Sequence, residues 1–210
     1  CATRTDTVNI TVDAIPTVAN AGTDQNICSA TTASLSANTP TVGTGAWTVI
    51  AGTGVVTTAN NPNSGVTSLT SGVNTFVWTI SNGSCAASND TVSIVIADSA
   101  TIANAGANQT LCNDSVFLNA NTALVGQGTW SLISGSGIFA NANSATTLVT
   151  GVGIGTNIFQ WTISNNPCPS SSAQVTITNV CAPIAVDDNY STPFQTVLNG
   201  TTVLSNDTDP

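Results

Sequence analysis

The sequence predicts an all-β protein made of tandem β-sandwich repeats. Three observations lead to this prediction: apolar residues alternate with polar ones along short segments, turn residues separate these segments, and one unit of about 83 residues occurs twice. Val, Ile and Thr, which favour strands, are abundant, and no segment repeats apolar residues at the helical spacing.

The repeat sets the domain boundaries that we expect. Residues 17–28 read TVANAGTDQNIC and residues 101–112 read TIANAGANQTLC, while GTGAWTVIAGTG from Gly43 matches GQGTWSLISGSG from Gly126. CATRTDTVNITV at the start matches CAASNDTVSIVI from Cys85. We therefore expect residues 1–15 to be the last strand of a preceding repeat, 16–99 to be repeat 1 and 100–181 to be repeat 2. Residues 182–210 match neither and are expected to begin a different, incomplete domain or to complete another chain as an exchanged strand.

Each repeat is expected to contain about seven short strands, as in a β-sandwich. In the fullest segment Phe76, Trp78 and Ile80 share one face, and Phe159, Trp161 and Ile163 repeat this pattern. The next segment places Val92, Ile94 and Ile96 on one face, so the two segments predict a hairpin. Five further strands are expected around Gln25, Leu35, Trp47, Val55 and Val66. All four Trp fall on expected core faces.

Charge composition excludes most chemistry. The chain has one basic residue, Arg4, ten acidic residues that are all Asp, no His and a formal net charge of −9. It therefore lacks an imidazole base, an amine nucleophile and a basic patch for phosphates. We expect no catalytic residues, no cofactor, no nucleic-acid partner and no membrane insertion, and an enzyme is the least favoured class.

The six cysteines indicate disulfides. Without His or a Cys-x-x-Cys pair the sequence does not favour zinc, and disulfides imply an oxidising compartment. We expect each repeat to close its own bond, Cys28 with Cys85 and Cys112 with Cys168. Cys1 and Cys181 would then be unpaired within this sequence. A lipoprotein cysteine is the alternative for Cys1, and Cys181 could bond a following domain, another chain or nothing.

The repeated motifs resemble a known family. ANAGxxQxxC, GxGxW, NxFxWTISNxxC and DTVxI are similar to the PKD-like or immunoglobulin-like repeats of large Bacteroidetes cell-surface proteins, of which gliding-motility adhesins are members. The resemblance covers about residues 1–181 and implies tandem immunoglobulin-like or PKD-like β-sandwiches, exported by type IX secretion. The segment AVDDNYSTPFQTVLNGTTVLSNDTDP resembles the start of cadherin-like bacterial domains.

Two kinds of candidate site follow. The Asp-Ser/Thr-apolar pattern of Bacteroidetes O-glycosylation occurs at Thr7, Thr91, Ser99 and Ser115, although a Thr-rich chain also produces such matches by chance. Carboxylates near the C-terminal domain junction predict a calcium site, with a solvated acidic edge as the alternative. The carboxylates concerned are Asp187, Asp188, Asp207 and Asp209.

The function expected from these observations is mechanical. The chain would form stalk or spacer repeats of an extracellular adhesin or surface filament, located at the cell surface. Its expected partners are neighbouring repeats, identical chains in a filament, and surfaces or glycans bound through parts outside this sequence. The alternative is a carbohydrate-binding accessory module of a secreted multidomain enzyme. Threonine arrays that bind ice or crystalline glycan are a minor alternative, since the Thr positions do not recur strictly between repeats.

Overall fold

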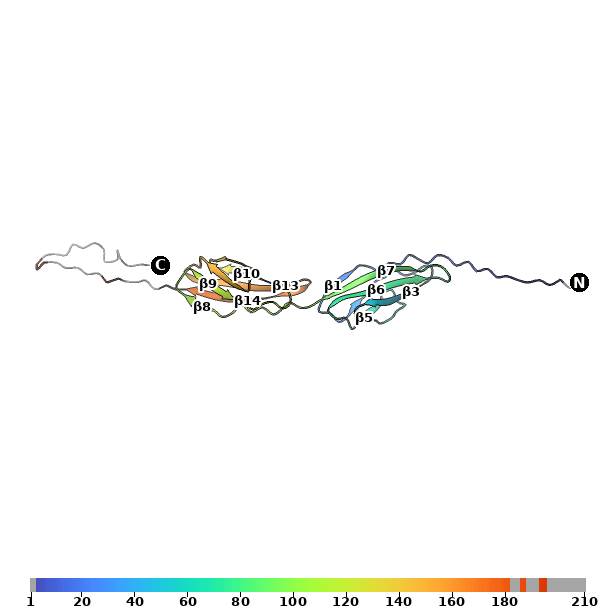
Figure 1. Cartoon of the computed structure of the whole chain (residues 1–210), viewed down its shortest axis with the longest axis horizontal. Coiled ribbons are helices and arrows are strands. Elements are labelled where there is room, and N and C mark those ends of the chain that lie inside the picture. Colours follow the sequence, from blue (N-terminus) through green and yellow to red (C-terminus); the bar gives the residue numbers. More distant parts are fainter. Residues whose placement is uncertain (1–2, 182–185, 188–192, 196–210) are drawn as a thin grey trace. The chain divides into compact units, whose positions relative to one another are not determined.

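The computed structural model describes residues 3–181, 186–187 and 193–195. The chain divides into two compact units, which Figure 1 shows as separate groups of strands. Unit 1 contains residues 1–99 together with 165–169, and unit 2 contains residues 100–164 and 170–210. The described residues form strands, turns and irregular segments only, so the all-β prediction is confirmed. Among them there is no helix of the length and apolarity that crossing a membrane requires.

Unit 1 is a β-sandwich of a four-stranded and a three-stranded sheet. The larger sheet has the order β1-β7-β6-β3 and the smaller one the order β2-β5-β4. Strand β1 runs parallel to β7, whereas β6 is antiparallel to both β7 and β3. The strands are β1 (Gln25–Cys28), β2 (Ala33–Ser34), β3 (Thr44–Ala51), β4 (Val55–Val56), β5 (Gly65–Thr67), β6 (Gly72–Ser81) and β7 (Ser88–Ala97).

Unit 2 repeats this topology. Its sheets have the orders β10-β13-β14-β8 and β11-β12-β9, and β8 runs parallel to β14. The tip of the β13–β14 hairpin, residues 165–169, belongs to unit 1. The strands are β8 (Gln109–Leu111), β9 (Ser115–Asn119), β10 (Gln127–Ser134), β11 (Ile138–Phe139), β12 (Thr146–Thr150), β13 (Gly155–Asn165) and β14 (Cys168–Asn179).

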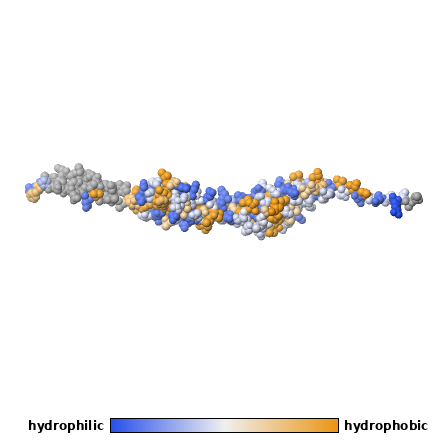
Figure 2. All heavy atoms as spheres, viewed as in Figure 1, coloured by the Kyte–Doolittle hydropathy of each residue, from blue (hydrophilic) through white to orange (hydrophobic). Residues whose placement is uncertain are grey.

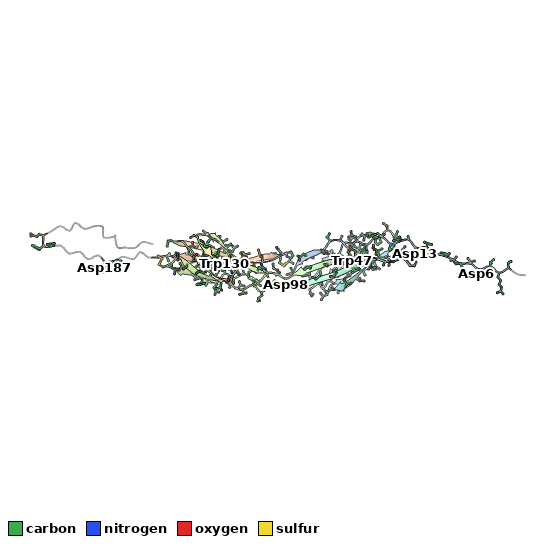
Figure 3. All side chains as sticks on the ribbon, turned by 45° about the horizontal axis from the view of Figure 1, so that its top comes forward. Asp6, Asp13, Trp47, Asp98, Trp130 and Asp187 are labelled. Carbon is green, nitrogen blue, oxygen red and sulfur yellow. A yellow bond between two sulfur atoms is a disulfide. The ribbon has the colours of Figure 1, made fainter. Side chains whose placement is uncertain are left out.

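Each core lies between its two sheets and contains the residues that the alternation placed there. Phe76, Trp78 and Ile80 are fully buried, and Trp47 is 3% exposed. Trp47 lies directly opposite Trp78 in the β3–β6 ladder, with ring centroids 5.1 Å apart. Figure 3 shows Trp47 and Trp130 among the packed side chains of their units. Outside the cores, polar and apolar atoms are interspersed on the visible face of each unit (Figure 2).

The repeated motif residues are explained by backbone geometry. Gly22 has a φ of +87°, and a Cβ there would overlap the Ser36 carbonyl oxygen. The Gln25 side-chain amide donates to the Ser34 carbonyl over 2.8 Å and so connects β1 to β2 of the other sheet. The side chain of Gln109 makes the corresponding bond to Phe117. These motif residues therefore stabilise the sandwich, the glycine by allowing a close backbone contact and the glutamines by hydrogen bonds between the two sheets.

Residues 3–12 form no strand, although they match the sequence of β7. Val8, Ile10 and Val12 are 79%, 83% and 88% exposed. An alternating segment becomes a strand only when a neighbouring strand accepts its hydrogen bonds. Within the described residues no strand pairs with this segment.

Asn74 is a buried polar residue that the sequence analysis missed. It is 1% exposed and lies on the buried face of β6, before Phe76. Its Oδ1 accepts from the Thr53 amide at 3.0 Å, and its Nδ2 donates to the Thr70 carbonyl at 3.2 Å. Asn157 makes the equivalent bonds in unit 2.

Replacing Asn74 by Ala is expected to destabilise unit 1 by about 1–3 kcal/mol, because the buried side-chain amide would no longer bond the Thr53 amide and the Thr70 carbonyl. Urea denaturation followed by tryptophan fluorescence measures this loss. Asn89→Ala, at an exposed position of β7, is the matched control and should change stability by less than about 0.5 kcal/mol. Equal effects of the two substitutions would contradict the role given to Asn74.

Candidate functional site

The most distinctive feature of the structure is its disulfide pattern, and here the predicted pairing was wrong. Cys28 bonds to Cys168 rather than to Cys85, and Cys112 bonds to Cys181 rather than to Cys168. Cys85 is a free cysteine. Cys1 lies outside the described residues. Cys181, expected to be unpaired, is therefore bonded within its own repeat.

The strand register explains why Cys28 cannot reach Cys85. The parallel pairing of β1 with β7 places Cys28 opposite Ala97, the last residue of β7. Cys85 lies before the first residue of β7, so the ten residues of that strand separate the two, or about 33 Å at ~3.3 Å per residue. A disulfide requires Cα atoms within about 7 Å. Cys28 and Cys168 have a Cα separation of 4.8 Å.

The same geometry separates Cys112 from Cys168. Cys168 begins β14, whereas Leu111 pairs with Asn179 at the other end of that strand. Cys112 thus lies beside Val180, whose amide donates to the Leu111 carbonyl at 2.8 Å. Cys181 follows directly, and the Cα atoms of Cys112 and Cys181 are 4.5 Å apart. The bond closes the end of the β8–β14 pair.

The hairpin tip that carries Cys85 rests on the segment before repeat 1. Its thiol donates to the Asp13 carbonyl at 3.5 Å, and the Asn82 side-chain amide donates to the Ala14 carbonyl at 2.8 Å. The Ser84 amide donates to the Asp13 carboxylate at 2.7 Å, and the Ser84 hydroxyl approaches the same oxygen at 3.0 Å. Asp13 is the charged group of this contact.

The hydrogen bonds from the Ser84 amide and hydroxyl hold the pKa of Asp13 below its ordinary value. A carboxyl group whose pKa is lower in the folded state than in the unfolded state stabilises the folded protein when the pH is above the unfolded-state pKa. This stabilisation is lost as the pH falls through the folded-state pKa. We therefore expect the contact to be complete at neutral pH and to weaken only at strongly acidic pH. The Ser84 amide chemical shift, followed by NMR across a pH titration, should report a midpoint below that of an ordinary Asp. Asp13→Asn should abolish this titration, and a midpoint above the ordinary value would contradict the assignment.

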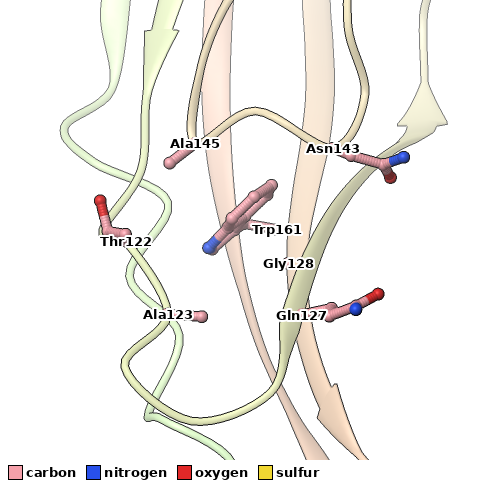
Figure 4. A pocket seen from close by; sticks show the side chains of 7 residues that line it. All are labelled: Thr122, Ala123, Gln127, Gly128, Asn143, Ala145 and Trp161. Carbon is pink, nitrogen blue, oxygen red and sulfur yellow. The ribbon is translucent and has the colours of Figure 1, made fainter.

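Each unit has a small cavity next to the glycine of its Gly-x-Trp motif. In unit 2 the cavity is about 280 Å³, and Figure 4 shows Trp161 at its centre, with Thr122 and Ala123 on one side and Gln127 and Gly128 on the other. A Cβ at Gly128 would overlap the Trp161 ring, which explains the Gly-x-Trp motif. The corresponding cavity of unit 1, next to Gly45, is about 360 Å³.

These cavities do not present aromatic platforms. Trp161 is 1% exposed and Trp78 is fully buried, so neither offers a ring face to a sugar. The Nε1 atoms of both are buried without a hydrogen-bond partner. By contrast, Nε1 of Trp47 donates to the Pro62 carbonyl at 3.2 Å. The expectation that all four Trp are core residues is thus confirmed.

The four expected O-glycosylation residues differ in accessibility. Thr7, Thr91 and Ser99 are exposed, and Ser115 is half-buried at the start of β9. The Ser99 hydroxyl lies 2.8 Å from that of Ser29. Glycosylation at these positions stays a prediction.

Of the four carboxylates expected to bind calcium, only Asp187 lies in the described part of the chain, where it is exposed. Asp188, Asp207 and Asp209 lie outside the described residues. Within the described residues no group of three or more acidic or cysteine side chains is arranged to hold a metal ion. The calcium site stays a prediction.

Comparisons with known proteins identify the fold. No protein-family model and no curated protein match this sequence. Among solved structures, extracellular domains 3–5 of Drosophila OTK are similar with a TM-score of 0.57 and 14% identity, over 76% of this chain and 60% of that chain. Immunoglobulin domains 1–5 of Sidekick-1 are similar with a TM-score of 0.57 and 10% identity, over 83% of this chain and 41% of that chain. The chain thus spans less than two thirds of either structure. At such identities the likeness establishes the fold, and the chain consists of tandem immunoglobulin-like β-sandwiches, as predicted.

Proposed function

We propose that this chain forms part of an extracellular stalk at the cell surface, in which immunoglobulin-like repeats act as spacers that project an adhesive region. The disulfides support an oxidising, extracellular location. The β-sandwich repeat supports a rod whose length increases with the number of copies. Neighbouring repeats, and identical chains in a filament, are its expected partners.

The observation that carries the proposal is the position of the Cys28–Cys168 bond. It connects cysteines 140 residues apart, one in the opening strand of repeat 1 and the other in the hairpin of repeat 2. The hairpin tip belongs to unit 1 and continues along the chain into β13 and β14. A force applied to the two chain ends would pass through this covalent bond and bypass most of both sandwiches. Such an arrangement suits a structure that is pulled.

The positions of the aromatic residues argue against the alternative, a carbohydrate-binding module. Such a module would need aromatic faces open to a glycan, and the four Trp are between 0% and 3% exposed. The repeated Gly and Gln residues are occupied in packing and hydrogen bonding within each sandwich. The motifs that the two repeats share therefore support a structural role.

The finer parts of the proposal rest on the resemblance to repeats of large Bacteroidetes surface proteins. They are export by type IX secretion, a role in a gliding-motility type of adhesin, and O-glycosylation at exposed Thr7, Thr91 and Ser99. Intact mass of the protein from its natural source tests the last of these. A mass equal to that of the bare polypeptide would remove glycosylation from the proposal.

The proposal is tested by electron microscopy of intact source cells labelled with antibody against residues 17–181. We expect label along thin fibres that leave the cell surface. Label confined to released, compact particles would favour a secreted, modular protein instead. A glycan array probed with the fluorescent 210-residue chain complements this test, and micromolar binding to a polysaccharide would contradict a pure spacer role.

A further inference from the structure

The two hairpin tips contain cysteines at equivalent positions but in different states. Cys85 lies in the turn between β6 and β7, and Cys168 lies 83 residues later at the turn between β13 and β14. Cys168 is bonded to Cys28, whereas Cys85 is free and half-buried. The sequences around Cys85 and Cys168 are similar. The difference between the two cysteines must therefore arise from the segments that contact each hairpin tip.

Both tips rest on the chain in the same way. The Cys168 Sγ lies 3.5 Å from the Ala97 carbonyl oxygen, and the Asn165 side-chain amide donates to the Asp98 carbonyl at 2.8 Å. Cys85 has the same 3.5 Å distance to the Asp13 carbonyl, and Asn82 makes the same 2.8 Å bond to Ala14. Asp13 and Ala14 precede repeat 1 just as Ala97 and Asp98 precede repeat 2. The tip of repeat 1 thus already has the arrangement of the bonded tip.

The end of strand β1 places Cys28, the disulfide partner, next to Cys168. Strand β1 lies parallel to β7 and places Cys28 opposite Ala97, and the Ser29 amide donates to the Ala97 carbonyl at 2.8 Å. The end of β1 and the hairpin tip therefore both contact the Ala97 carbonyl oxygen. At the Asp13 carbonyl the hairpin tip is present, and in the part of the chain that the structure describes no strand pairs with residues 3–12, which correspond to β7. What the second site lacks is a counterpart of β1.

We propose that Cys85 is the acceptor of a disulfide from another copy of this repeat, whose opening strand, with the sequence Gln-x-x-Cys, pairs with residues 10–13 as β1 pairs with Ile94 to Ala97. That strand would lie beside Ile10 and Val12, which are 83% and 88% exposed. The first cysteine of each such repeat would then bond to the hairpin cysteine of the next repeat, and its own hairpin cysteine would bond to the first cysteine of the preceding repeat. This inference goes beyond the spacer role, because it holds whatever the stalk projects.

Cys112 and Cys181 show where such a series ends. Cys112 is the counterpart of Cys28, but it bonds to Cys181 at the end of β14 in its own repeat. The position of Cys181 corresponds to Asp98 in repeat 1, which leaves Cys28 without a partner there. The first cysteine of repeat 2 therefore bonds within its own repeat, whereas the first cysteine of repeat 1 bonds to the hairpin of the next repeat.

Bond formation is an oxidation that needs an acceptor of electrons. The two thiols lose two protons and two electrons as the S–S bond forms, and a disulfide oxidant such as oxidised glutathione takes them up and becomes two thiols. The thiol of Cys85 is half-buried and its partner would arrive on a strand end, so pairing of the strand precedes oxidation.

The test is a chain with one more repeat, in which residues 16–99 are repeated directly after Ser99 and Cys1→Ser removes the remaining thiol. After refolding with reduced and oxidised glutathione, free thiols are counted by alkylation under denaturing conditions and mass spectrometry. The proposal predicts one free thiol, at the original Cys85. The original Cys28 would bond Cys85 of the added copy, and Cys28 of the added copy would bond Cys168. Three free thiols would overturn the proposal.

Two variants of this longer chain separate the pairings. Cys85→Ser in the original copy should leave no free thiol, because that residue is unbonded there. Two free thiols in this variant would mean either that Cys28 bonds Cys85 within one copy or that no bond forms between the copies, and either result would overturn the proposal. Cys85→Ser in the added copy should instead leave two free thiols, at the original Cys28 and Cys85. Circular dichroism of each variant confirms that it is folded before thiols are counted.

Discussion

Replacing both Cys28 and Cys168 by Ser is expected to lower the free energy of unfolding of the chain by about 4 to 5 kcal/mol. The bond spans 140 residues, and the chain-entropy estimate gives this value for loops of 100 residues or more. The double substitution leaves neither partner with a free thiol. Urea denaturation followed by tryptophan fluorescence measures the loss.

The matched control for this prediction is Cys85→Ser. Cys85 is free, so its replacement should change stability by less than about 0.5 kcal/mol. A bond between Cys28 and Cys85 within repeat 1 would instead make Cys85→Ser costly, and Cys168→Ser alone would then leave the stability of unit 1 unchanged. A loss below about 1 kcal/mol for the double variant would contradict the observed bond.

Replacing Trp161 by Ala is expected to destabilise unit 2 by about 3–5 kcal/mol, because it leaves a large cavity in the core. Trp161 is 1% exposed and its ring packs on Trp130, with centroids 5.2 Å apart. Thermal or urea unfolding of the variant measures the loss. A cost below about 1 kcal/mol would mean that the indole does not occupy the core.

The Phe variants of the two Trp of unit 2 separate packing from hydrogen bonding. Trp161→Phe removes an Nε1 that has no partner, whereas Trp130→Phe removes one that donates to the Ser144 carbonyl at 3.1 Å. The second substitution should therefore include an additional loss of about 1 kcal/mol. A greater loss for Trp161→Phe would indicate that its Nε1 has a partner after all.

The strands and core faces could be predicted because alternation and repetition both act locally. Phe76, Trp78 and Ile80 share a face in any extended segment, and their recurrence at Phe159, Trp161 and Ile163 excludes chance. The same argument could have found Asn74. It occupies a position of the buried face, and Asn157 repeats it, so a polar residue there required buried partners.

The disulfides could not be predicted in this way, because pairing depends on which strands are neighbours. Sequence proximity favoured bonds within each repeat, but the parallel β1–β7 pairing places Cys28 at the end of β7 that is remote from Cys85. A pairing shifted by one repeat uses as many cysteines as the pairing that was predicted. Only the strand order distinguishes them, and the alternation of apolar residues does not contain that order.

The central claim, that covalent bonds clamp these repeats against extension, is tested most directly by pulling single chains from their two ends. Under oxidising conditions we expect the 140 residues between Cys28 and Cys168 to stay locked, and reduction to release roughly 490 Å of additional contour length at ~3.5 Å per residue. An oxidised chain that extends to the same length as the reduced chain would contradict the clamp and, with it, the proposed role as a stalk.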